Sequence, residues 1–331
     1  MYIYILGRPH CGSTLLGTLL GDSPDVASAG ELVHVRNAEG MCSCGATITA
    51  CPFWRRVRGI LQQQHIGWNE ATQAAYSQAH VRRFLHTWLA PTNDPDLCHL
   101  ARFTQALARA ICEIRNKPHL LDSTKEVTRA LFLAKYIPET HIIHLVRDPR
   151  DSVSSHYWRW KDHGYFFFLR RKRRMRLFGP LFMMLAAANW SVGNLLAELV
   201  TRRMGARTIR VRYEDLCRDP AKELTRISMR FGIDVGPVIE RIRIGCPFVA
   251  EHNVGGNQVR FERALQFDPD RQRQRRPLPL WLRGLVVVSC WPLMLRYRYP
   301  LRTTRMHCAA AKNSPQDPPS PAKAANRLPE G

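Results

Sequence analysis

The sequence lacks any apolar run long enough to cross a membrane. Its longest apolar stretch, residues 284–295, falls well short of the roughly 20 residues that a membrane-spanning helix needs. The opening segment, residues 1–6, is apolar but too short for the hydrophobic region of a signal peptide, and it has no basic flank. We therefore expect no transmembrane helix and a cytoplasmic location.

Acidic residues are scarce relative to basic ones. The 331 residues include 27 Asp and Glu against 49 Lys and Arg, which gives a formal net charge of +22. Such an excess favours anionic partners, and the candidates are a nucleotide, a sulfated or phosphorylated substrate, nucleic acid and an acidic membrane surface. No recognised nucleic-acid-binding module accompanies the charge, so we expect no nucleic-acid partner.

The cysteines are too sparse for a disulfide scaffold, with ten in a chain of this length. Three of them nevertheless cluster, because Cys42 and Cys44 stand in a Cys-Ser-Cys-Gly segment and Cys51 follows closely. A zinc site would need a fourth ligand and usually has a wider first spacing. We therefore expect packed thiols and no metal, and a metal site or a regulatory disulfide remains an alternative.

Short apolar runs alternate with helical patterns along most of the chain. Four runs are typical of buried strands, and they span residues 2–6, 119–121, 142–146 and 208–211. Helical patterns follow these runs, at residues 13–20, 126–136, 149 onward and 220–231. The last two begin with Asp-Pro, where the carboxylate can cap the helix and proline is tolerated. This alternation predicts an α/β fold with a doubly wound, mostly parallel sheet of the P-loop type and helices on both faces.

We expect one α/β domain at residues 1–308. Residues 36–118 and 160–190 interrupt the alternation and are predicted to be helical insertions. The tail at residues 309–331 is rich in Pro, Ala and Ser and is expected to be disordered.

The segment Gly7–Thr14 has the length and glycine positions of a P-loop and stands between a predicted strand and a predicted helix. Backbone amides in such a loop, with the helix N-terminus behind it, surround a phosphate with donors, and Gly12 lets the main chain approach closely. The lysine that follows this glycine in ATP and GTP hydrolases is missing, and Ser13 stands in its place. The loop therefore favours a phosphate other than a nucleoside triphosphate, although a nucleotide kinase or hydrolase remains an alternative. The candidate ligand-binding residues here are Arg8, His10, Cys11, Gly12, Ser13 and Thr14.

A second segment, Arg147–Ser155, directly follows the third apolar run. It closely resembles the 3′-phosphate-binding signature of sulfotransferases that use 3′-phosphoadenosine 5′-phosphosulfate (PAPS). The resemblance implies that Arg147 and Ser155 hold the 3′-phosphate of PAPS as co-substrate, with no metal required. A guanidinium suits this role because it makes bidentate, charge-assisted contacts with phosphate.

Two later segments extend the resemblance. Residues 212–216, Arg-Tyr-Glu-Asp-Leu, are similar to the family segment whose tyrosine approaches the adenine, which implies a cofactor contact for Tyr213. Residues 255–260 resemble the late glycine-containing loop that closes over the 3′-phosphate, and Arg260 is the candidate there. The similarity covers about residues 2–35 and 119–260.

The resemblance implies transfer of a sulfuryl group to an acceptor hydroxyl by in-line displacement. The motifs are closest in style to those of bacterial, carbohydrate and tyrosylprotein sulfotransferases, in which a glutamate shortly after the first helix is the general base. Glu31 stands at that place, and His34 is an alternative base because histidine titrates near neutrality. Lys125, in the segment Asp-Ser-Thr-Lys, is expected to stabilise the sulfuryl oxygens, and Ser123 is a further candidate for that region.

One position departs from the family pattern. The loop has His10 where the family usually has lysine or arginine, which would donate to the oxygen that bridges phosphate and sulfate. A histidine carries charge only when it is protonated. We therefore expect either an activity that weakens above the pKa of His10 or a substitute cation such as Arg8.

The acceptor is not fixed by any motif, so carbohydrate, lipid, small molecule and peptide tyrosine all remain open. We expect residues 36–118 and 160–190 to supply the acceptor pocket. Within the second region, residues 166–185 combine Phe166–Phe168, the basic run Arg170–Arg174 and an apolar stretch. This segment is a candidate for peripheral contact with an anionic membrane, for a lid over the acceptor or for a solvated face, and a non-enzymatic basic protein that binds membranes or nucleic acid is the remaining alternative.

Overall fold

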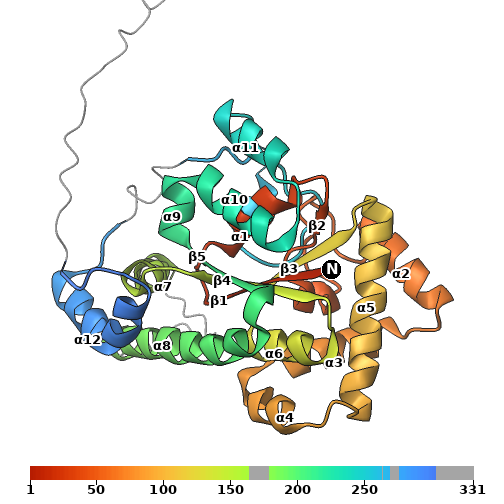
Figure 1. Ribbon diagram of the computed structural model, residues 1–331, viewed down its shortest axis with the longest axis horizontal. Helices are drawn as coiled ribbons and strands as arrows, with labels where there is room; N and C mark the ends of the chain where they lie inside the picture. Colours follow the sequence, from red (N-terminus) through yellow and green to blue (C-terminus); the bar gives the residue numbers. More distant parts are fainter. Residues whose placement is uncertain (164–178, 263, 269–275, 303–331) are drawn as a thin grey trace, which may run out of the picture. The chain divides into compact units, whose positions relative to one another are not determined.

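A five-stranded parallel sheet forms the centre of the molecule (Figure 1). The computed structural model describes residues 1–163, 179–262, 264–268 and 276–302. Its strands are β1 (Tyr2–Gly7), β2 (Val26–Ser28), β3 (His119–Lys125), β4 (Thr140–Val146) and β5 (Thr208–Arg212). They lie in the order β2-β3-β1-β4-β5, and every neighbouring pair is parallel. The predicted α/β fold with a parallel sheet is therefore confirmed.

Strand β1 is buried on both faces, as expected for the central strand of a parallel sheet. Tyr2, Tyr4 and Leu6 belong to one hydrophobic cluster, whereas Ile3 and Ile5 belong to another. The first cluster includes side chains of α6 (Val127–Tyr136) and α8 (Gly179–Met204). The second includes side chains of α1 (Ser13–Gly21), α9 (Tyr213–Arg218) and α10 (Pro220–Phe231). Figure 1 shows these two sets of helices on opposite faces of the sheet.

Residues 36–118 form helices that extend the first cluster beyond the sheet. They are α2 (Pro52–Gln63), α3 (Trp68–Ala79), the short 3-10 helix η2 (Val81–Arg83), α4 (Phe84–Leu89) and α5 (Pro95–Arg115), and the 3-10 helix η1 (Leu32–Arg36) precedes them. Asp94 begins α5 by accepting a hydrogen bond from the amide of Leu97 (3.0 Å). Phe53, Trp54 and Leu107 of these helices are buried with the β1 tyrosines, so the insertion shares a core with the sheet.

A third cluster joins α7 (Pro149–His163), α8 and α12 (Leu280–Arg296). Beyond β5 the chain also forms η4 (Gly205–Arg207), α11 (Gly236–Arg243) and η5 (Gln258–Phe261). Among the described residues one helix, Leu181–Arg207, is long and apolar enough to cross a membrane, but half of its apolar window is buried inside the protein. Most of this segment belongs to α8, which packs against the sheet and against α12. Its apolar residues are therefore buried as those of a core helix are.

Two expectations fall outside the described residues. Most of the segment 166–185, on which the peripheral membrane contact depends, lies in the gap before α8. The tail expected to be disordered, residues 309–331, also lies outside them.

Candidate functional site

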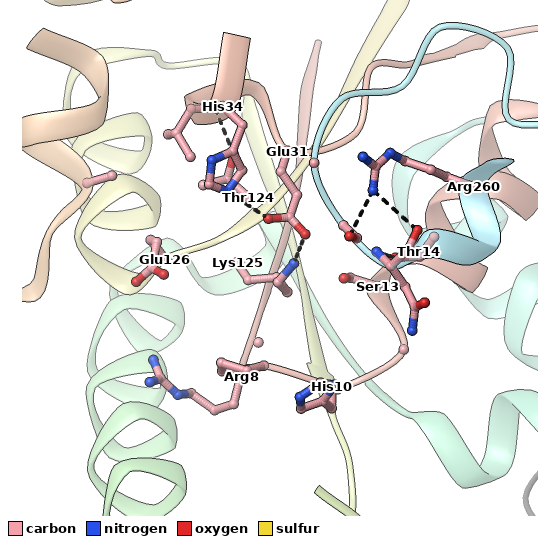
Figure 2. Close-up of a pocket in the computed structure, with 18 of the residues that line it drawn as sticks. Arg8, His10, Ser13, Thr14, Glu31, His34, Thr124, Lys125, Glu126 and Arg260 are labelled. Atoms are coloured by element: carbon pink, nitrogen blue, oxygen red, sulfur yellow. Dashed lines mark hydrogen bonds and ion pairs between the residues drawn. The ribbon is translucent and has the colours of Figure 1, made fainter. Parts of the chain in front are cut away.

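A cavity of about 1110 Å³ opens at the carboxyl ends of β1, β3 and β4 (Figure 2). Parallel α/β sheets bind ligands at this edge. Every site residue that the sequence suggested, except Cys11 and Ser123, lines the cavity. The site therefore gathers side chains from segments more than 200 residues apart.

The phosphate loop follows β1 and leads into α1. Gly12 has a φ of +98°, and a Cβ atom on it would lie 2.1 Å from the ring of Tyr213. Only glycine fits this backbone without strain. No side chain at Gly12 caps α1, and the first helical residues Ser13 and Thr14 line the cavity. The amide end of a helix in this position attracts anions.

Cys11 is placed differently from its neighbours in the loop. Its side chain is buried in the core beneath the loop, and its amide donates to the carbonyl of Arg8 (3.0 Å). In this conformation Cys11 offers the cavity no free donor. The motif of the phosphate loop does not show which of its side chains face the cavity and which are buried.

Arg147 lies at the end of β4 and is only 2% exposed. Its Nη1 donates to the carbonyl of His10 (2.8 Å), and its guanidinium lies 4.7 Å from the centre of the Tyr213 ring. The buried Nε and Nη2 atoms have no hydrogen-bond partner among the residues that the structure describes, although the Asp151 carboxylate is 3.9 Å from Nη2. Unsatisfied buried donors are costly, so an anion that accepts from them binds favourably. Ser155, two turns into α7, lines the same part of the cavity.

Glu31 and Lys125 form a buried ion pair across the cavity wall, and Figure 2 shows His34 on the other oxygen of the same carboxylate. The Nε2 atom of His34 lies 3.2 Å from Oε2 of Glu31. Burial alone would raise the pKa of Glu31, but Lys125 and His34 outweigh it and lower this pKa to about 2. Burial would likewise lower the pKa of Lys125, and Glu31 reverses the effect and raises it. The pair is therefore ionised at neutral pH.

The backbone holds both members of the pair in place. The amide of Glu31 donates to the carbonyl of Val254 (2.7 Å), and Lys125 has a φ of +75°, which is rare for a residue with a side chain. Asp122 anchors the end of β3 because it is fully buried and accepts from Thr124 and Arg129. Thr124 rather than the candidate Ser123 reaches the cavity.

His10 is neutral in this structure. Burial, followed by the neighbouring His156 and Arg159, lowers its pKa to about 2. The rings of His10 and His156 meet edge to face at 4.6 Å, and the buried Nε2 of His10 has no hydrogen-bond partner within the described part of the chain. Titration of His10 near neutrality, which the sequence suggested as a cause of lost activity, is therefore not expected here.

Arg8 is the other cation proposed for this part of the loop. Its Nη2 donates to Oδ1 of Asn189 (2.5 Å), and a Cβ atom on Gly193 would lie 2.5 Å from the Arg8 side chain. Figure 2 shows the guanidinium of Arg8 directed toward α8, which carries both of these residues. Arg8 lines the cavity but is held by α8 rather than by the loop.

Arg260 closes the opposite side of the cavity. Its Nη1 donates to the carbonyl of Gly256 (2.9 Å), while its buried Nε has no hydrogen-bond partner among the described residues. The amide of Asn257 donates to Oγ1 of Thr14 (3.2 Å), which joins this late loop to the phosphate loop. Burial lowers the pKa of Arg260, and Glu31 partly opposes this.

Several lining residues were not found from the sequence. Arg159 lies one turn after Ser155 on α7, so its i+4 spacing was a usable signal. Tyr76 lies on α3 and His80 directly follows this helix, and their rings meet edge to face with centroids 4.8 Å apart. They carry no local sequence signal, because only the packing of the insertion brings them to the cavity.

Comparisons with known proteins identify the family and the fold of the chain. A family model described as "Sulfotransferase family" matches residues 3–237. Two solved structures are similar in fold, and each covers 91% of this chain. The sulfotransferase domain of the olefin synthase from Synechococcus PCC 7002 is 22% identical with a TM-score of 0.51, and 95% of that chain is covered. The sulfotransferase domain from the curacin biosynthetic pathway is 17% identical with a TM-score of 0.50, and 98% of that chain is covered. No curated protein matches the sequence.

Proposed function

The chain belongs to the sulfotransferase family, and from this premise we propose that it transfers a sulfuryl group from PAPS to an acceptor hydroxyl. The main support is a cavity that contains two separate groups suited to bind anions. One is the phosphate loop at the start of α1, and the other is the buried, incompletely paired guanidinium of Arg147. PAPS differs from ADP in requiring both, because it carries a 3′-phosphate as well as the 5′-phosphosulfate.

The donor is proposed to span these two groups. The 5′-phosphosulfate accepts from the loop amides and from Ser13 and Thr14, and the 3′-phosphate accepts from Arg147 and Ser155. Tyr213, which packs on Gly12 and under Arg147, is suited to contact the adenine between them. Arg260 is suited to close the site from the late loop. Ser13 at the position of the P-loop lysine speaks against the kinase or hydrolase alternative.

Glu31 is the proposed general base. In the transfer it takes the proton of the acceptor hydroxyl, the acceptor oxygen bonds to sulfur, and the bond from sulfur to the phosphate oxygen breaks. A carboxylate with a pKa of about 2 is a weak base. Burial raises the pKa of Glu31, and the charge of Lys125 is the largest of the effects that lower it. When the sulfuryl oxygens attract the Lys125 ammonium, Glu31 loses part of its pairing and becomes more basic. The same movement places the positive charge of Lys125 beside the sulfuryl group during its transfer.

His10 is suited to assist the leaving group. As a neutral imidazole it donates one N–H, and its position in the phosphate loop faces the oxygen that bridges phosphate and sulfur in the proposed complex. Charge stabilisation then comes from Lys125, Arg147 and the loop amides, so the proposed transfer step requires no metal ion.

The chemical class of the acceptor has to be defined by an assay. Tyr76 on α3 and His80 at its end line the cavity together with Val192 and Leu196 of α8. The four side chains form a mixed polar and apolar wall. Carbohydrates, lipids, small molecules and peptide tyrosines are all hydroxyl acceptors that such a wall can contact.

Incubation with ³⁵S-labelled PAPS and pools of these four acceptor classes tests the proposal. We expect label to appear in one class with the unsubstituted protein and at least 100-fold more slowly with Glu31→Gln, since a general base contributes about 10²–10⁴-fold. The matched control is Glu240→Gln, on an exposed face of α11, which should transfer at the original rate. Transfer of ³²P from ATP with magnesium in the same pools, without any ³⁵S transfer, would contradict it.

A further inference from the structure

Three cysteines and one histidine meet outside the cavity. They are Cys42, Cys44, Cys51 and His252, and their ligand atoms all lie within 4.8 Å of one another. The cysteines come from one short segment, whereas His252 follows Cys51 by 201 residues. The sequence showed no fourth ligand beside the cysteines, and the fold supplies one.

Four of the six distances between these ligand atoms fit a tetrahedral zinc ion, and the other two do not exceed 4.8 Å. The sulfur of Cys51 lies 3.7 Å from those of Cys42 and Cys44, and Nδ1 of His252 lies 3.4 Å from Cys51 and 3.7 Å from Cys42. Zinc bonds of about 2.3 Å to sulfur and 2.0 Å to nitrogen at tetrahedral angles place sulfurs about 3.8 Å apart and nitrogen about 3.5 Å from sulfur. We propose that Cys42, Cys44, Cys51 and Nδ1 of His252 bind one Zn²⁺ ion at a structural site.

The backbone arranges the first two ligands before any metal binds. The amide of Cys42 donates to the carbonyl of Ala46 (2.8 Å), and the amide of Gly45 donates back to the carbonyl of Cys42 (3.0 Å). This tight turn requires the φ of +88° at Gly45, which glycine adopts without strain. It brings the sulfurs of Cys42 and Cys44 to the same side. Cys51 is fixed separately, because it begins α2 and its amide donates to the carbonyl of Thr47 (2.8 Å).

The surroundings orient the histidine and balance the charge. The His252 ring stacks on Phe53 with centroids 5.0 Å apart and planes 3° from parallel, which holds Nδ1 toward the sulfurs. Three thiolates and a neutral imidazole around Zn²⁺ carry a net charge of −1. The guanidinium of Arg115, 4.7 Å from the centre of the Phe53 ring, supplies positive charge nearby and pairs with Glu251. Ligand-bearing residues of metal sites commonly have such supporting contacts.

A disulfide explains the cluster less well. It would use two sulfurs and leave the third sulfur and the histidine ring without a role, whereas zinc uses all four groups. Zinc binding changes no oxidation state, and the protons of the three thiols leave to solvent. Cys42 and Cys51 are fully buried while Cys44 is exposed, so the ion can reach the site from the surface.

The position of the site gives it a structural role next to the cavity. Cys42 forms an antiparallel bridge with Val254, and the amide of Ser43 donates to the carbonyl of Asn253 (3.0 Å). Val254 also accepts from the amide of Glu31. Zinc therefore joins the start of the helical insertion to the loop that continues into Gly255 and Arg260.

Metal analysis of the full-length protein tests the proposal without relying on any variant. Protein expressed with zinc in the medium and purified without chelators should contain about one zinc per chain. Replacement of zinc by Co²⁺ should give thiolate-to-cobalt charge-transfer absorption and the strong visible bands of a tetrahedral site. Fewer than about a tenth of an equivalent of zinc in folded protein, or an intact mass two units low from a disulfide among the three cysteines, would overturn the proposal.

Variants then locate the metal. Cys44→Ser and His252→Ala should each lose most of the zinc in competition with a chelator and should alter the cobalt spectrum. Cys98→Ser, at a thiol that instead contacts the carbonyl of Thr92, is the matched control and should keep about one zinc per chain. A cobalt spectrum that neither ligand variant changes would place the metal elsewhere and refute this assignment.

Discussion

Glu31 and Lys125 show how one buried pair sets the charge of the site. Either group alone would be driven toward its neutral form by burial, and together they stay charged because each offsets the desolvation of the other. A buried pair of this kind adds little net stability relative to an apolar pair, but loss of one partner is costly because the other charge is left unpaired. Such an arrangement suits a site that must exchange one anionic partner for another.

The stability of the protein should depend on pH through Glu31. Its folded pKa of about 2 lies below its ordinary value of 4.5, so the stabilisation is fully present above about pH 5 and is lost as pH falls toward 2. A shift of this size corresponds to about 3 kcal/mol at neutral pH. Glu31→Gln should therefore lower the free energy of unfolding by about 3 kcal/mol at pH 7, and by much less near pH 3. Urea denaturation at the two pH values measures this, and a difference that stays the same at both would show that Glu31 is not the titrating group.

The phosphate loop shows an element whose shape depends on one glycine. The motif, its place between a strand and a helix, and the missing lysine were all evident in the sequence, and β1 and α1 confirm the flanking elements.

The short strand β2 and helix α9 were not predicted, because three and six residues give too little periodicity. The helix expected at Asp219 is confirmed, since its carboxylate accepts from the amide of Lys222 (3.0 Å).

Substitution at Gly12 should disrupt the loop and α9 together. Gly12→Ala places a methyl group into the Tyr213 ring at a φ of +98°, and we expect a loss of about 2–4 kcal/mol in unfolding free energy together with weaker nucleotide binding. The control is Gly59→Ala within α2, where no described atom lies within 4 Å of the new methyl group and a gain of about 0.5–1 kcal/mol is expected. Chemical denaturation measures the free energy of unfolding of both variants. If Gly12→Ala is as stable as Gly59→Ala, the loop tolerates a side chain.

Across the whole chain, local motifs could be predicted from the sequence, whereas the packing that brings distant segments together could not. The strands place Arg8, Lys125 and Arg147 at one edge because parallel strands end together, and this rule is available from sequence alone. The approach of His252 to the cysteines depends on packing across 201 residues, for which no local pattern exists. The net charge of +22 favours anionic ligands as a class but cannot separate the two groups of one cavity that we propose to bind anions.

Calorimetric titration with adenosine 3′,5′-bisphosphate, with ADP and with ATP plus magnesium tests whether the cavity is a PAPS site. We expect the bisphosphate to bind with a Kd on the order of micromolar, and Arg147→Ala to weaken it by roughly 10–100-fold while leaving ADP affinity nearly unchanged. Ser155→Ala should show a smaller loss in the same direction, and Arg109→Ala, on an exposed face of α5, should show none. Circular dichroism should confirm that each variant is folded. Equal affinity of the folded Arg147→Ala variant for the bisphosphate, or a preference of the unsubstituted protein for ATP with magnesium, would contradict the proposed PAPS site.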